Sequence, residues 1–120
     1  MKLATLRTTV ATVALLSAPL AWAHAYPKHQ EPPAGSTAPA TLNAVVIDFD
    51  DGLEPAFSSI DVKDAQGKSV IREKAKVDAN DNKRMSVGLT PLTPGVYTVA
   101  WVAVAADGHR TQGHYQFTVK

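Results

Sequence analysis

The sequence predicts an all-β protein, a Greek-key β-sandwich or barrel, on three observations. About seven short runs alternate apolar with polar residues, which is the period of a strand with one buried face. Turn signals rich in Gly, Pro, Asn and Asp separate these runs, and no helical period extends beyond one turn. The length of 120 residues fits one domain.

Residues 1–23 are predicted to be a cleavable secretory signal peptide. Lys2 and Arg7 supply the positive start, an apolar stretch follows, and Ala21-Trp22-Ala23 offers small residues where signal peptidase cleaves. A membrane anchor is the alternative, but a span takes about 20 apolar residues and this stretch is shorter. Cleavage would leave a domain of residues 24–120.

The predicted strands of that domain follow one another with short connections. The stretch from Tyr26 to Pro39 holds four prolines, so it is expected to be extended rather than helical. The runs with strand period are Leu42–Asp50, Ser58–Lys63, Ser69–Lys76, Met85–Leu89, Val96–Ala105 and Gly113–Val119. Turns are expected at Gln66-Gly67, Asn80-Asp81-Asn82 and Pro94-Gly95.

The longest run, Val96–Ala105, is apolar on both faces. One face carries Tyr97, Val99 and Trp101, and the other carries Val96, Val102 and Val104. A strand of this kind is expected to be central in its sheet and buried on both sides.

Composition excludes several classes of protein. With no cysteine, the chain has no disulfide scaffold, iron–sulfur cluster, thiolate zinc site or blue-copper centre. The formal net charge is +1, and it becomes −1 once Lys2 and Arg7 are removed. Such a balance, without a basic cluster, argues against a nucleic-acid binder. A metal site built from nitrogen and oxygen ligands stays open.

His24 would be the first residue after cleavage. A free α-amine has a pKa of about 7.7–8.0, far below that of lysine, so it is available as a ligand near neutral pH. The amine and the ring Nδ1 of one residue can close a chelate on a single metal ion. The alternative is an exposed histidine that signal peptidase happens to leave at the terminus.

Asp107-Gly108-His109 favours the metal-binding alternative. Side chains at positions i and i+2 point the same way in extended chain, so Asp107 and His109 can converge on one ion. Alone, this triplet is more often a plain turn. Combined with His24 it makes three nitrogen donors and one oxygen, which suits tetragonal Cu(II), although zinc also accepts such ligands. Met85 is the only methionine after residue 23, so the soft sulfur ligands that select Cu(I) are lacking.

The other polar residues have simpler interpretations. His29 is expected to be exposed, with assistance to the metal as the alternative, and His114 is expected to be solvated on the outer face of its strand. Asp48, Asp50 and Asp51 are expected to be solvated carboxylates at the end of an edge strand.

Several segments in the same order resemble the copper resistance protein C (CopC) family. They are His24-Ala25, P-P-A-G-S at 32–36, F-D-D-G-L-E at 49–54, P-G-V-Y-T-V-A-W at 94–101, D-G-H at 107–109 and G-H-Y-Q-F-T-V at 113–119. The resemblance implies a cupredoxin-like, immunoglobulin-like periplasmic barrel that binds copper without catalysis. It places one Cu(II) on His24, Asp107 and His109, with Asp51 as a weaker candidate where some members have glutamate.

The resemblance also bears on the type of copper carried and on partners. Members that carry Cu(I) as well have a methionine-rich loop, whereas the corresponding stretch Asp78–Ser86 offers only Met85. This favours the Cu(II)-only type, a carrier or buffer in copper homeostasis and resistance. An inner-membrane copper protein, the D component, is the expected partner, and the chain itself is expected to be a monomer.

Two other functions compete with a copper carrier. A histidine-brace monooxygenase would need an open coordination position and a substrate platform, but Asp107 adds negative charge beside the copper and no exposed aromatic platform is evident. A structural sandwich module would have no reason to begin at His24. Neither alternative explains the pattern as well as a binding protein does.

Overall fold

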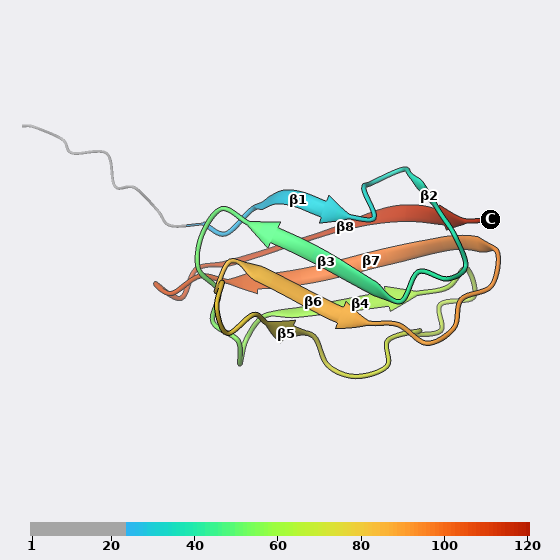
Figure 1. Cartoon of the computed structure of the whole chain (residues 1–120). Coiled ribbons are helices and arrows are strands. Elements are labelled where there is room, and N and C mark those ends of the chain that lie inside the picture. Colours follow the sequence, from blue (N-terminus) through green and yellow to red (C-terminus); the bar gives the residue numbers. More distant parts are fainter. Residues whose placement is uncertain (1–23) are drawn as a thin grey trace, which may run out of the picture.

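Two four-stranded sheets face each other in the computed structural model, which describes residues 24–120 (Figure 1). The strands are β1 (Pro27–Glu31), β2 (Thr37–Ala38), β3 (Ala44–Phe49), β4 (Ser59–Lys63), β5 (Lys76–Val77), β6 (Arg84–Gly88), β7 (Gly95–Val104) and β8 (Arg110–Val119). One sheet has the order β1-β3-β6-β5 and the other β2-β8-β7-β4. The all-β sandwich is thus confirmed, and the predicted signal peptide lies outside the described residues.

The core lies between the sheets and is filled by the alternating residues of the predicted strands. Val45, Ile47 and Phe49 of β3 are all buried. Phe49 meets Trp101 of β7 edge to face, with ring centroids 5.4 Å apart, a favoured geometry for aromatic pairs. The buried apolar side chains of residues 24–120 form one hydrophobic cluster between the two sheets.

The expected strand at Ser69–Lys76 is wrong. Ser69 and Ile71 form only isolated bridges, to Lys63 and Leu89, and regular pairing begins at β5. The reason is the run of charged side chains at residues 72–74, which are exposed and interrupt the alternation that a half-buried strand needs.

The expectation that β7 is buried on both sides is also wrong. β7 is central, since β8 and β4 pair with its two edges, and its inner face is buried. On its outer face, however, Val96 is 43% exposed, and Val102 and Val104 are only half-buried. Pairing within a sheet covers the edges of a strand, whereas covering a face needs another layer, and residues 24–120 form only two.

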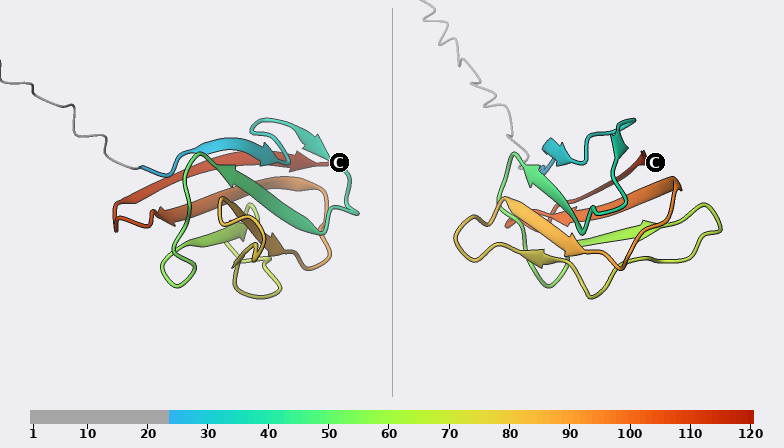
Figure 2. Two further views of the ribbon diagram at one scale, coloured as in Figure 1. Left: turned by 60° about the vertical axis from the view of Figure 1, so that its left-hand side comes forward. Right: turned by 45° about the vertical axis from the view of Figure 1, so that its right-hand side comes forward.

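One end of the sandwich gathers three segments that are distant in the sequence. The start of β1, the β3–β4 connection and the β7–β8 loop lie together there, opposite the C-terminus (Figures 1 and 2). Backbone hydrogen bonds join them to their neighbours: Asp50 donates to Tyr26 at 2.9 Å, and Glu54 donates to Val104 at 2.8 Å. Residues 24–120 include no helix long and apolar enough to cross a membrane.

Candidate metal centre

A tight loop between β7 and β8 holds Asp107 and His109. The Gly108 amide donates to the Ala105 carbonyl at 2.8 Å, and the Ala105 amide donates to the His109 carbonyl at 2.9 Å. Gly108 has a φ of 88°, in the left-handed region that favours glycine. Asp107 Oδ1 accepts the His109 amide at 3.0 Å, as short polar residues do in turns. The loop therefore fixes the backbone of both candidate ligands.

The side chains of Asp107 and His109 converge. Asp107 Oδ2 lies 2.8 Å from His109 Nδ1, and each side chain is 36% exposed. Two donors at right angles on one ion, each at about 2.0 Å, would be about 2.8 Å apart. The same separation is that of a charge-assisted hydrogen bond, so it is compatible with a shared metal ion but is not specific to one. Both side chains are exposed enough for an ion to reach them.

The His24 ring lies beside the His109 ring at the same end of the sandwich. Their centroids are 5.3 Å apart, with the planes at 63°. Among the described residues, His24 Nδ1 is buried and has no hydrogen-bond partner. A buried polar atom without a partner is uncommon and costly in proteins. A nitrogen in this state beside another imidazole is chemically suited to a metal ion.

The backbone after His24 is held on two sides, by residues that the sequence did not indicate. Thr111 Oγ1 donates to the Ala25 carbonyl, and Asp50 Oδ1 accepts the Tyr26 amide at 2.8 Å. These bonds join residues 86 and 24 positions apart in the chain. No local pattern signals such partners, so nothing in the sequence could have identified them.

Asp51, the weaker candidate, is bound within its own loop. Its Oδ1 accepts the Gly52 amide at 2.8 Å, and the residue is half-buried. Counting side chains alone, residues 24–120 contain no group of three or more His, Asp or Glu arranged to hold a metal ion. The side chains of His24, Asp107 and His109 come near one another but do not by themselves complete a site.

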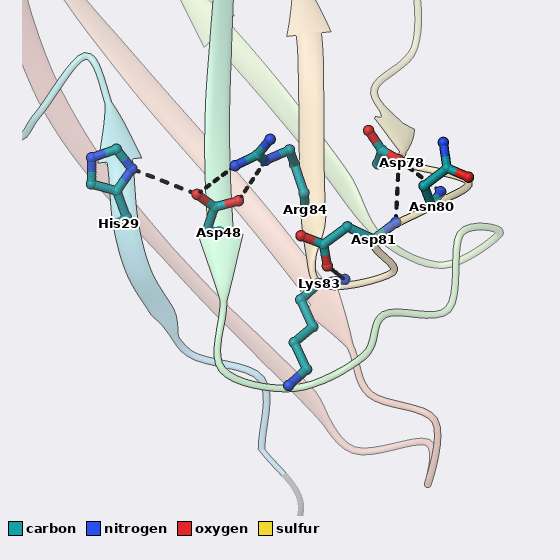
Figure 3. Close-up of polar contacts among 7 residues, drawn as sticks. All are labelled: His29, Asp48, Asp78, Asn80, Asp81, Lys83 and Arg84. Carbon is teal, nitrogen blue, oxygen red and sulfur yellow. Dashed lines mark hydrogen bonds and ion pairs between the residues drawn. The ribbon is translucent and has the colours of Figure 1, made fainter.

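His29 and Asp48 form a separate group of charged side chains together with Arg84 (Figure 3). His29 Nδ1 lies 3.6 Å from Asp48 Oδ2, and Arg84 Nε donates to Asp48 Oδ1 at 2.7 Å. The Arg84 guanidinium holds the pKa of Asp48 below its usual value. The expected edge position is wrong, because β3 lies inside its sheet and Asp48 is an ion-pair partner there. His114 is exposed on β8, as predicted.

In the polar loop between β5 and β6, the aspartate side chains accept hydrogen bonds from backbone amides of the same loop (Figure 3). Asp78 Oδ1 accepts the Asn80 amide at 2.7 Å, and Asp81 Oδ1 accepts the Lys83 amide at 3.1 Å. Met85, which follows this loop on β6, is fully buried. Its thioether therefore cannot serve a metal ion at the surface without opening the core.

Comparison with known proteins gives a consistent assignment. The CopC domain family matches residues 27–120. Protein YobA of Escherichia coli K12 is 39% identical over 106 residues, covering 88% of this chain and 86% of that protein. Copper transport protein CutJ of Bacillus subtilis is 31% identical over 99 residues, which are 82% of this chain but 18% of that longer protein.

Solved structures agree with these matches. CopC from Methylosinus trichosporium OB3b superposes with a TM-score of 0.75 at 34% identity, covering 81% of this chain and 94% of that one. PcoC, a methionine-rich copper resistance protein from Escherichia coli, superposes with a TM-score of 0.72 at 30% identity, covering 82% and 100%. Sequence and fold therefore point to the same group of proteins.

Proposed function

This chain belongs to the CopC family, and we propose that it is a periplasmic Cu(II) carrier or buffer in copper homeostasis and resistance. CopC-family proteins bind copper, are typically periplasmic and are generally non-enzymatic. The finer proposal concerns this chain: it binds one Cu(II), through residues at the end of the sandwich where β1 begins.

The observation that carries the proposal is the state of His24. Its Nδ1 is buried without a hydrogen-bond partner among the described residues, and its ring lies 5.3 Å from that of His109. Asp107 adds a carboxylate 2.8 Å from His109 Nδ1. Imidazole nitrogens with a carboxylate oxygen are the donors that favour Cu(II), which also leads the divalent affinity series.

The fourth donor is proposed to be the α-amine that cleavage after Ala23 would create. Within residues 24–120, side chains alone do not form a group of three ligands that could hold a metal ion. The nitrogen of His24 is an amide while Ala23 is attached, and an amide nitrogen has no basic lone pair to donate. Processing would supply a third nitrogen without any change in the fold.

The preference for Cu(II) over Cu(I) rests on the thioethers. PcoC is described as methionine-rich, whereas this chain has two methionines. Of these, Met85 is fully buried, and Met1 would leave with the signal peptide. Without accessible soft sulfur ligands, the site has no feature that selects Cu(I).

The partner is proposed to be an inner-membrane copper transport protein of the D type. The support is the Bacillus relative, named as a copper transport protein, in which the matching segment is less than a fifth of a longer chain. In the Bacillus protein, a segment similar to this chain is part of a much longer copper transport protein. A separate transporter is therefore the partner expected for this chain.

A competition experiment tests the proposed ligands. Protein processed to begin at His24 is titrated with Cu(II) against a chelator, together with His109→Ala and the control His114→Ala. His114 lies on the same strand, is exposed and is not a proposed ligand. We expect His109→Ala to weaken Cu(II) binding by orders of magnitude and His114→Ala to leave it unchanged. Equal affinity in wild type and His109→Ala would refute the assignment.

A further inference from the structure

Ala25 and Tyr26, the two residues after His24, are held to the sandwich from two sides. Ala25 is fully buried, and its carbonyl accepts a hydrogen bond from Thr111 Oγ1 on β8. The Tyr26 amide donates to Asp50 Oδ1 at 2.8 Å, and the Tyr26 carbonyl accepts the Asp50 amide at 2.9 Å. His24 therefore joins directly to a backbone that is bonded to β8 and to the residue that follows β3.

Burying the hydroxyl group of Thr111 costs free energy unless that group makes a hydrogen bond. It is one of two buried polar residues in the described part, at 8% exposure, and its neighbours along the inner face of β8 are mostly apolar. Its single proton has two acceptors in reach, the carbonyl of Ala25 and, at 3.5 Å, that of Ala103. The longer distance is at the limit of a hydrogen bond, so the Ala25 carbonyl takes the proton.

Asp50 uses its side chain in the same way. Its carboxylate accepts the Tyr26 amide, a donor at the point where β1 has not yet begun its regular pairing with β3. The bond needs an acceptor oxygen at this position and not a negative charge. A carboxamide would therefore replace it, whereas a methyl group would not.

The geometry points to Thr111 and Asp50 as positioning residues of the copper site. We infer that they hold His24-Ala25-Tyr26 in place before copper arrives, so that the terminal amine and imidazole already face His109. This inference rests on the proposed function, because the segment His24-Ala25-Tyr26 (the N-terminal arm) presents ligands only if copper binds there. Ordering a loose residue would lower affinity by roughly ten-fold for each residue fixed.

The test uses protein that begins at His24, which contains the whole described core. The variants Thr111→Val and Asp50→Ala each remove one hydrogen bond, while Thr111→Ser and Asp50→Asn retain it. Thr118→Val is the matched control, a threonine at the far end of β8. Two quantities are measured: the hydrogen-exchange rate of the Tyr26 amide without metal, and Cu(II) affinity by chelator competition. Urea unfolding verifies that each variant is folded.

We expect Thr111→Val and Asp50→Ala to exchange the Tyr26 amide about ten-fold faster and to bind Cu(II) about ten-fold more weakly. Thr111→Ser, Asp50→Asn and Thr118→Val should remain near wild type. Unchanged exchange and affinity in both Thr111→Val and Asp50→Ala would overturn the inference, and so would a loss in Asp50→Asn equal to that in Asp50→Ala.

The two proposals fail separately in this experiment. In one outcome, wild type binds no Cu(II), but its Tyr26 amide exchanges slowly and exchanges faster in Thr111→Val. That result would show that the segment His24-Ala25-Tyr26 is held in place and that the proposed function is wrong. In the other outcome, wild type binds Cu(II) tightly, but the Tyr26 amide exchanges rapidly in wild type and in all variants. The proposed function would then stand, and the positioning role of Thr111 and Asp50 would be refuted.

Discussion

Replacing Gly113 by alanine should destabilise the sandwich through one contact. Gly113 of β8 pairs with Trp101 of β7. A Cβ at Gly113 would lie 2.6 Å from Cζ2 and 2.9 Å from Cε2 of the Trp101 indole. Trp101 is only 7% exposed and its ring already packs on Phe49, so the indole cannot move aside freely.

The size of the effect follows from two opposing contributions. Forcing an extra carbon into a packed core costs about 1–3 kcal/mol, while replacing glycine stabilises by about 0.4–1 kcal/mol through the unfolded state. The middle values of these ranges are about 2 and about 0.7 kcal/mol, so the free energy of unfolding should fall by about 1.3 kcal/mol. With a urea m-value of about 1–1.5 kcal/mol/M, the unfolding midpoint should drop by about 1 M.

Urea unfolding followed by Trp101 fluorescence measures the change, because Trp101 is the only tryptophan in residues 24–120. Gly88→Ala on β6 is the matched control, since a Cβ there would meet only the Arg72 Cβ, at 4.0 Å. Its midpoint should equal or slightly exceed that of wild type. A Gly113→Ala midpoint as high as wild type, or an equal loss in Gly88→Ala, would refute the reasoning.

Three further predictions concern charge. Asp107→Asn removes a negative charge beside the proposed copper, so voltammetry should show a higher reduction potential with a modest loss of affinity; an unchanged potential would place Asp107 outside the ligand set. Burial raises the pKa of Tyr115 to about 12, so the urea midpoint of wild type should fall as pH rises from about 10. The midpoint of Tyr115→Phe should change less over the same range, and equal losses in the two proteins would argue against this role of Tyr115. Arg84 lowers the pKa of Asp48, so the stabilisation is present above about pH 4 and is lost as pH falls through the lowered value. Wild type and Asp48→Asn should therefore differ in urea midpoint at pH 6 and converge near pH 2, and a gap that persists there would contradict the ion pair.

Alternation predicted the fold well wherever one face of a strand meets the core. Val45, Ile47 and Phe49 show this, because burial of every second side chain leaves a direct record in the sequence. The same reasoning failed for the outer face of β7. The apolar character of Val96 and Val102 does not specify whether another layer covers them, since that depends on how many layers the whole chain forms.

The candidate site was predictable in part, for a similar reason. His24 and His109 were selected for their chemistry, and the structure places their rings side by side. Thr111 and Asp50 have no chemical signature, because an ordinary hydroxyl and an ordinary carboxylate gain their role only from distant backbone groups. The roles of neighbouring carboxylates likewise depend on register: Asp50 accepts the Tyr26 amide, whereas Asp51, the weaker candidate ligand, accepts the Gly52 amide of its own loop.

Copper binding by this chain is proposed to need the free amine of His24. The decisive measurement is Cu(II) affinity by chelator competition, with EPR of the bound ion, for three forms: protein beginning at His24, protein with one glycine before His24, and the unprocessed chain. We predict full affinity only for the first form, because the other two hold that nitrogen as an amide. Equal affinity and identical spectra in all three would contradict the claim and leave a site made of side chains alone.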